Sequence, residues 1–128
     1  MTKTILAAAV SAAALLASAR APAQAGGVAK AFSELEAEHG NASSGIWTAY
    51  ASGAAAGLAW ANSMLEARDE RRLYCPPRGT VQNPRDTAEI ALREYQGNKP
   101  RYDSLDKQPA EAVALAAVSG LIAKWPCK

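Results

Sequence analysis

The sequence predicts a small all-α domain, a bundle of about four helices held by one disulfide. Apolar residues recur at helical spacing in segments of ten residues or more, and no segment alternates apolar and polar residues as a strand does. Prolines and glycines stand at the ends of these segments, where helices start and stop. Two cysteines, Cys75 and Cys127, make one bridge available. A helical bundle buries such apolar faces against one another.

The N-terminal segment, residues 1–25, reads as a secretory signal peptide. Lys3 precedes an uncharged run from Ile5 to Ala17, and Ala23-Gln24-Ala25 is a small-x-small cleavage site. A second possible cut follows Ala19, but we expect cleavage after Ala25. The uncharged run is well short of the ~20 residues that a bilayer span needs, so we expect no stable membrane anchor. The exported domain would be residues 26–128.

The first helix is predicted from Val28 to Glu38, because four apolar residues share one face. Gly40 is well placed to end it. The second and longest helix is predicted from Ile46 to about Leu73, with Ser43 or Ser44 as its cap. Its expected apolar face consists of Ile46, Tyr50, Gly53, Gly57, Trp60 or Ala61, Met64 and Leu65.

Gly53 and Gly57 form a Gly-x-x-x-Gly spacing in this second helix. Glycines at that spacing let another backbone come close, at some cost in helix propensity. We expect the face that contains Tyr50, Gly53 and Gly57 to pack against another helix of the bundle. A homodimer seam is the alternative, and periodicity alone does not separate the two.

The third helix is predicted to begin at Pro84 with Asn83 as its N-cap, and to run to about Gln96. Residues 98–108 read as an exposed polar connection. The last helix opens at Pro109 and ends before Pro126, with an apolar face that includes Val113, Ala116, Ala117, Gly120 and Leu121.

The two cysteines are expected to form a structural disulfide, Cys75–Cys127. An exported chain meets an oxidising compartment, where a lone pair of cysteines reads as a bridge. Closing a loop of about fifty residues removes roughly 4 kcal/mol of unfolded-state entropy on the chain-entropy model. A catalytic thiol would need a Cys-x-x-Cys spacing or a histidine partner, and the sequence Cys75-Pro76-Pro77-Arg78 supplies neither.

Charge and motif content argue against several classes of function. Once Lys3 and Arg20 leave with the signal peptide, twelve basic and twelve acidic residues remain, so nothing favours nucleic acid as a partner. We find no nucleophile–base set, no nucleotide-binding loop and no metal-ligand cluster. The only histidine, His39, reads as a solvated turn residue. We therefore expect no enzyme, no metal and no cofactor, but a domain that binds a protein.

Several motifs, taken in order, resemble the Rap/Tai family of periplasmic immunity proteins. They are Tyr50-x-x-Gly53, then Tyr74-Cys75-Pro76-Pro77, and finally Trp125-Pro126-Cys127. The resemblance covers about residues 46–127. Many members of that family carry a further cysteine pair, one cysteine of which precedes the Tyr-x-x-Gly helix. This chain has no cysteine there, and it has Cys-Pro-Pro where the family commonly has Cys-Ile-Pro.

The resemblance implies a periplasmic protein that blocks a peptidoglycan amidase effector of the type VI secretion system. Family members dimerise and insert a surface loop or helix end into the amidase groove. In this chain the constrained loop from Pro76 to Pro84 is the candidate wedge. We expect the partner-binding side chains to be Arg78, Gln82, Asn83 and Arg85, since Arg is favoured at binding hot spots.

Two other functions remain open for an exported, disulfide-linked helical domain. One is a periplasmic acid-stress chaperone, which would expose apolar surface when its carboxylates are protonated. The other is an inhibitor of a different wall-degrading enzyme. A partner captured only in acid would favour the chaperone, and a single partner captured at neutral pH would favour an inhibitor.

Overall fold

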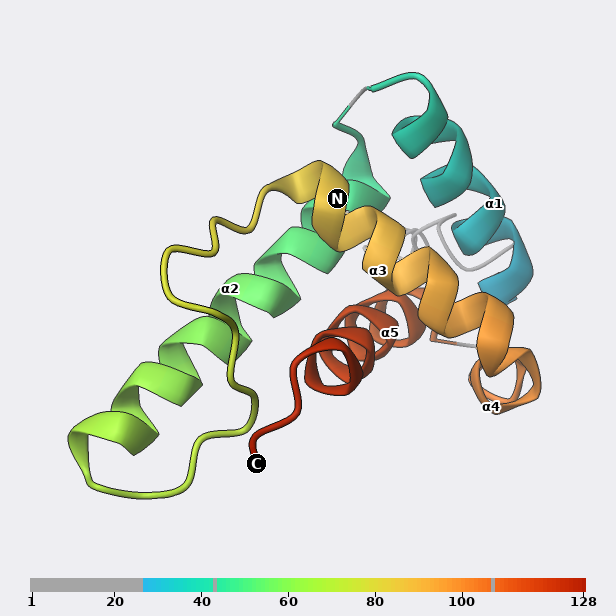
Figure 1. Ribbon diagram of the computed structural model, residues 1–128. Helices are drawn as coiled ribbons and strands as arrows, with labels where there is room; N and C mark the ends of the chain where they lie inside the picture. Colours follow the sequence, from blue (N-terminus) through green and yellow to red (C-terminus); the bar gives the residue numbers. More distant parts are fainter. Residues whose placement is uncertain (1–26, 43, 107) are drawn as a thin grey trace, which may run out of the picture.

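The structure, a computed structural model, describes residues 27–42, 44–106 and 108–128 (Figure 1). The expected signal peptide lies outside these residues. Within them the fold is all-α, as predicted, with four long helices and one short one. The helices are α1 (Gly27–Gly40), α2 (Ile46–Ala67), α3 (Pro84–Gly97), α4 (Lys99–Asp103) and α5 (Pro109–Lys124).

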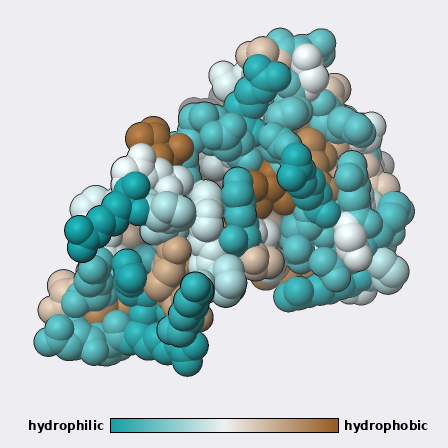
Figure 2. Space-filling view, in the orientation of Figure 1, coloured by the Kyte–Doolittle hydropathy of each residue, from teal (hydrophilic) through white to brown (hydrophobic). Residues whose placement is uncertain are grey.

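Helix α5 is at the centre of the bundle and packs against α1, α2 and α3. The longest helix, α2, extends beyond the others, and the segment that follows it returns alongside it to the start of α3 (Figure 1). The C-terminus ends beside that returning segment (Figure 1). The face of the molecule seen in Figure 2 is mostly hydrophilic, with hydrophobic side chains visible between hydrophilic ones over α3.

Alanines make up much of the core, so the helices approach one another closely. One cluster contains Phe32, Tyr95 and Tyr102 together with a set of fully or almost fully buried alanines. The Phe32 and Tyr95 rings are stacked with centroids 3.9 Å apart, and Tyr102 meets both rings edge-on at 6.2 Å. A smaller second cluster holds Ala55, Leu58, Tyr74, Ile90 and Leu121.

The glycine that permits a close helix contact is Gly120 in α5. A Cβ atom there would lie 2.6 Å from Ile90 Cγ2 and 3.0 Å from the Ile90 carbonyl oxygen, both on α3. At Gly53 and Gly57 nothing lies within 4 Å of the Cβ position. The prediction that the Gly-x-x-x-Gly pair packs inside the bundle is therefore wrong for the part of the chain that the structure describes.

The buried face of α2 differs from the one predicted. Its buried residues are Trp47, Thr48, Ala51, Ala55, Leu58 and Asn62. The expected face is exposed at Ile46, Tyr50, Trp60 and Met64. The small residues Ala51 and Ala55 let α2 approach α5 and α3 closely, and Trp47 and Leu58 are the large side chains that this face buries.

The N-terminus of α2 is capped by α1 instead of by the expected serines. Gly45 occupies the N-cap and offers no side chain. Glu38 of α1 accepts hydrogen bonds from the Thr48 amide (2.8 Å) and hydroxyl (2.7 Å) and from the Trp47 amide (3.3 Å). Glu34 accepts a hydrogen bond from the Trp47 indole at 2.6 Å. Two carboxylates thus satisfy the first turn of α2 and fix the α1–α2 corner.

Helix α2 ends at Ala67, six residues before the predicted end at Leu73. The Asp69 amide bonds to the Glu66 carbonyl at 3.1 Å, and the Glu70 amide bonds to the Leu65 carbonyl at 2.9 Å. These two bonds form a Schellman motif, and Asp69 takes the left-handed conformation with φ 56°. The charged amphipathic pattern continues past the helix, so periodicity overestimated its length.

Residues 98–108 are not the exposed connection that the sequence predicted. They contain the short helix α4, and its Tyr102 side chain is fully buried in the aromatic cluster. The Tyr102 hydroxyl donates to Glu94 Oε1 at 2.8 Å, which satisfies the buried polar group. Asp106 then accepts a hydrogen bond from the Val28 amide at 3.1 Å and so ties this connection to the start of α1.

The first testable prediction concerns Gly120. We expect Gly120→Ala to destabilise the fold by about 1–3 kcal/mol, because a methyl group there forces α5 away from the Ile90 backbone. Gly97→Ala is the matched control, since nothing lies within 4 Å of its Cβ position. Urea unfolding measures both. Equal stability of the two variants would contradict the close α3–α5 contact.

The second prediction concerns alkaline pH. Burial raises the pKa of Tyr102 to about 12 from its ordinary 10.0, and the hydrogen bond to Glu94 adds to the rise. A raised pKa means that the neutral phenol contributes stability in full below pH 10, and that this contribution is lost as pH rises towards 12. We expect urea midpoints to fall across that window. Tyr102→Phe should flatten the fall, and the exposed Tyr50→Phe should not.

Candidate interaction surface

The segment that returns from α2 to α3 is fixed at Tyr74 by one buried side chain, Asn62 of α2. The Asn62 amide nitrogen donates to the Tyr74 carbonyl at 2.8 Å. Its oxygen accepts from the Leu73 amide at 2.8 Å and from the Tyr74 amide at 3.4 Å. Asn62 is 8% exposed and Tyr74 is 3% exposed, so these bonds are shielded from water. A single asparagine therefore replaces the backbone pairing that this extended segment lacks.

The next residue, Cys75, is bonded to the C-terminal segment, as predicted. Cys75 and Cys127 form a disulfide with their Cα atoms 5.0 Å apart. The Cys75 amide also donates to the Trp125 carbonyl at 2.7 Å. The Trp125 ring lies 6.4 Å from the Tyr74 ring and packs against the second core cluster. Residues 74–75 and 125–127 thus form one compact unit, which we call the Cys75–Cys127 junction.

Beyond this junction the chain forms an exposed turn. The Thr80 amide and hydroxyl both donate to the Pro77 carbonyl, at 3.1 and 2.7 Å. Gly79 has φ +80°, which the third residue of a type II turn requires and which glycine adopts without strain. Arg78 lies between Pro77 and Gly79 and is exposed. The turn presents the Arg78 side chain on a backbone fixed by proline, glycine and two hydrogen bonds.

The four residues predicted to bind a partner fall into two groups. Arg78 in the turn and Arg85 in the first turn of α3 are exposed. Gln82 is half-buried, and its amide lies 3.5 Å from the Tyr74 hydroxyl. Asn83 is the N-cap of α3, as predicted: its oxygen accepts from the Asp86 amide at 2.8 Å. Gln82 and Asn83 therefore support the loop, whereas the two arginines extend from it.

A hollow of about 390 Å³ adjoins this loop at the start of α3. Glu38 and His39 of α1 line one side, and Asn83 and Arg85 line the other. His39 Nε2 is buried there without a hydrogen-bond partner among the described residues. The half-buried His39 is thus part of the α1 surface beside α3, and not the solvated turn residue that the sequence predicted. Arg85 places a positive charge at the edge of this hollow.

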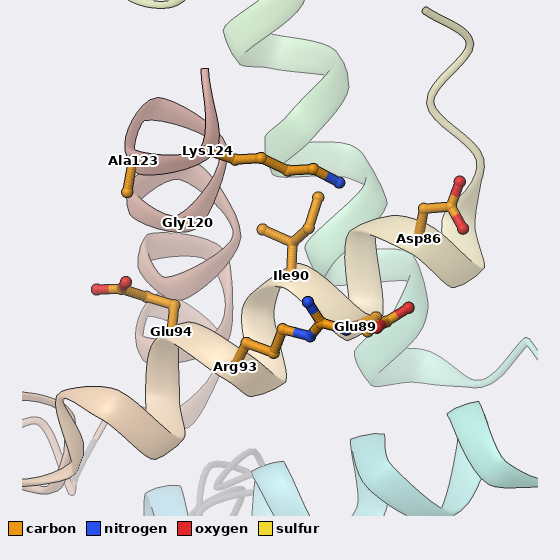
Figure 3. Close-up of a pocket in the computed structure, with 8 residues that line it drawn as sticks. All are labelled: Asp86, Glu89, Ile90, Arg93, Glu94, Gly120, Ala123 and Lys124. Atoms are coloured by element: carbon orange, nitrogen blue, oxygen red, sulfur yellow. Dashed lines mark hydrogen bonds and ion pairs between the residues drawn. The ribbon is translucent and has the colours of Figure 1, made fainter. Parts of the chain in front are cut away.

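A second hollow, of about 470 Å³, lies between α3 and α5 (Figure 3). Ile90 is at its centre, with charged side chains of both signs around it (Figure 3). Arg93 is paired with Glu89 one helical turn away. Gly120 also lines the hollow. The mixed charges around the hollow are on helix surfaces, and the Arg93–Glu89 pair is an i, i+4 pair of the kind that stabilises solvated helices.

Asp103, whose pKa is lowered, belongs to a structural cluster. Asp103 accepts hydrogen bonds from Lys99 Nζ and from the Tyr95 hydroxyl, both at 2.9 Å. The Lys99 hydrogen bond, followed by the Tyr95 bond, lowers the pKa of Asp103, and burial raises the pKa of Tyr95. This cluster joins α4 to α3. These bonds hold α4 in place against α3.

No three His, Cys, Asp or Glu side chains in ranges 27–42, 44–106 and 108–128 are grouped so that they could hold a metal ion. Among the helices described, none has both the length and the apolar character needed to cross a membrane.

Comparison with known proteins gives no relative for this chain. No family model, no curated protein and no solved structure matches it.

The third prediction tests Asn62. We expect Asn62→Ala to cost about 1–3 kcal/mol, because the buried Tyr74 carbonyl and Leu73 amide lose their partner. The freed segment should also let reductants reach the Cys75–Cys127 disulfide faster. Ser63→Ala is the neighbouring control, since the Ser63 hydroxyl bonds only to an exposed helix carbonyl. Wild-type reduction kinetics in Asn62→Ala would show that the segment is held by other contacts.

Proposed function

We propose that this protein is a periplasmic immunity protein that acts by binding, without catalysis, and that it occludes a peptidoglycan amidase effector of the type VI secretion system. The observation that carries the proposal is the exposed, pre-ordered turn at Arg78, placed directly after the Cys75–Cys127 junction. Such an element can enter the cleft of an enzyme as a wedge.

The geometry of the junction supports this function. Two of the motifs that resemble the Rap/Tai family, Tyr74-Cys75-Pro76-Pro77 and Trp125-Pro126-Cys127, are fifty residues apart in sequence but adjacent in space. They act together to hold one end of the exposed loop. Asn83, which caps α3, holds the other end. A loop fixed at both ends loses little conformational entropy when it binds, and this favours inhibition by insertion.

The chemistry of the loop suggests what the partner offers. Arg78 and Arg85 are both exposed cations, and Val81 between them is 81% exposed. A guanidinium donates up to five hydrogen bonds and binds carboxylates or carbonyl groups in a fork. A complementary cleft would therefore hold acidic or carbonyl oxygens beside an apolar wall.

The chaperone remains the second candidate, because carboxylates hold several helix junctions. Glu34 and Glu38 fix the α1–α2 corner, Asp106 bonds to the start of α1, and Asp103 holds α4. The lowered pKa of Asp103 means that its contribution to stability is present above pH 3.8 and is lost below it, as pH falls through the folded-state value. Acid would therefore weaken the bundle and release apolar surface.

The first experiment is a capture at neutral pH. The oxidised, exported protein is immobilised and exposed to secreted and periplasmic protein from the source cell and from competing bacteria. One stoichiometric partner with a cysteine amidase domain, whose peptidoglycan cleavage stops on binding, would support immunity. Many weak clients bound only in acid would favour the chaperone, and a captured lysozyme-like enzyme would favour the other inhibitor.

The fourth prediction concerns Arg78 in that complex. We expect Arg78→Ala to weaken binding to the amidase at least tenfold, which is about 1.4 kcal/mol, without a change in the urea midpoint. Arg93→Ala on α3 is the control: that arginine is also exposed but is paired with Glu89 away from the loop. Unchanged affinity in Arg78→Ala would remove the turn from the interface.

A further inference from the structure

The end of α1 meets the starts of α2 and α3 at one corner of the molecule (Figure 1), around the hollow of about 390 Å³. We call it the His39 hollow, because the half-buried His39 ring lines it. The Nε2 atom of that ring is buried and has no hydrogen-bond partner among the described residues. A buried nitrogen without such a bond costs stability and needs an explanation. A ligand that bonds to the imidazole when it enters the hollow supplies one.

A guanidinium group stands at the edge of the same hollow. Arg85 is in the first turn of α3, where it lines the hollow and is exposed. The ion pairs within residues 27–42, 44–106 and 108–128 join other side chains, each to a neighbour one helical turn away. A guanidinium offers five N–H donors and no acceptor, and an imidazole can also donate. A ligand that suits both groups must therefore supply oxygen atoms that accept hydrogen bonds.

Other polar side chains around the hollow already have their hydrogen bonds inside the fold. Both ends of the Asn83 amide are bonded to Asp86, at 2.8 Å each. The Thr48 hydroxyl donates to Glu38, whose carboxylate also accepts hydrogen bonds from the first turn of α2. These side chains support the walls of the hollow. The imidazole and the guanidinium are the side chains whose donors are left for a ligand.

The charges on the walls decide which kind of anion fits. Glu38 brings one negative charge to the hollow and Arg85 brings one positive charge. A phosphate group carries about 1.5 to 2 negative charges at pH 7, so the carboxylate of Glu38 disfavours it. A carboxylate ligand carries a single charge, which the guanidinium matches. Its two oxygens can accept from the guanidinium and from the imidazole at the same time.

The size and the remaining walls suit a short organic group beside that charge. Ligand pockets in proteins have volumes of roughly 300–1,000 Å³ and are mostly apolar, with a few polar groups that fix the orientation of the ligand. The His39 hollow is within that range, and Ala42, Pro84 and Ala88 give it apolar walls. A carboxylate attached to a short aliphatic group would therefore meet apolar surface on one side and hydrogen-bond donors on the other.

We propose that the His39 hollow is a binding site for a carboxylate group, carried by the C-terminus of a peptide or by an acidic side chain. Arg85 holds one carboxylate oxygen and the His39 imidazole holds the other. The site is separate from the exposed turn at Arg78, and this inference does not rest on the proposed function. It gives a role to a ring that the bundle buries without satisfying its nitrogen.

The fifth prediction is tested by NMR titration of the oxidised, untagged protein. The chain has one histidine, so its imidazole signals report on the hollow directly. One probe is acetyl-alanyl-alanine, which ends in a carboxylate, and the other is acetyl-glutamate amide, whose carboxylate is in the side chain. We expect saturable shifts with a Kd of about 1 mM, which is usual for ligands of this size. The probe that binds more tightly identifies the source of the carboxylate.

The matched control probes are acetyl-alanyl-alanine amide and acetyl-glutamine amide, which have the same shapes without the charge. We expect them to bind at least tenfold more weakly, because they cannot pair with the guanidinium. Inorganic phosphate is the competing anion, and it should also bind more weakly than the carboxylate probes. Equal binding of the amides, tighter binding of phosphate, or no saturation by either carboxylate probe would overturn the proposal.

Two variants test the residues. Arg85→Ala should raise the Kd of the carboxylate probe at least tenfold without a change in the urea midpoint, and Arg93→Ala, two turns further along α3, should leave that Kd unchanged. His39→Phe keeps an aromatic ring but removes the unsatisfied nitrogen. It should therefore weaken binding at least threefold and leave the urea midpoint equal or higher. An unchanged Kd in either Arg85→Ala or His39→Phe would contradict the assignment.

Discussion

The fold depends on the anchoring of residues 74–75 between α2 and the C-terminus. After α2 ends at Ala67, the chain must return along that helix to begin α3, and sixteen residues without regular secondary structure make the return. Asn62 satisfies the backbone of this segment at Tyr74, while the Trp125 carbonyl and Cys127 hold Cys75. The same contacts close the second core cluster over α5. Without them the cluster loses Tyr74, and the loop that carries Arg78 loses its fixed end.

Local signals in the sequence were sufficient for much of this architecture. The start of α3 was predictable from Asn83-Pro84, because capping involves residues only three positions apart. The ends of α5 were predictable from its prolines, and the disulfide from the count of cysteines. The helix ends are determined by residues only a few positions apart. The disulfide pairing follows because the chain has only two cysteines. The exposed position of Arg78 followed in the same way from the flanking Pro77 and Gly79.

Features that depend on contacts between distant residues were not predictable. Glu38 and Asn62 occur in segments where nothing marks them as partners of Thr48 and Tyr74. Tyr102 is one aromatic residue in a polar segment, so its burial could not be inferred from composition. The error on α2 has a different origin. Its two faces are both uncharged, and the buried one mixes Trp47 and Leu58 with alanines and polar residues, so hydrophobicity favoured the wrong face.

The distribution of side chains on α2 follows from one constraint, which is that an alanine-rich bundle has thin interhelical space. Small residues such as Ala51 and Ala55 bring α2 close to α5, and Trp47 and Leu58 are the large residues that α2 buries. The chain has only three tryptophans, and one of them is 74% exposed. Trp60 is two residues from the buried Leu58, which places it on the opposite side of the helix, away from α5 and α3. The side of α2 on which a large residue stands therefore decides its burial, because Trp47 is on the side that faces the bundle.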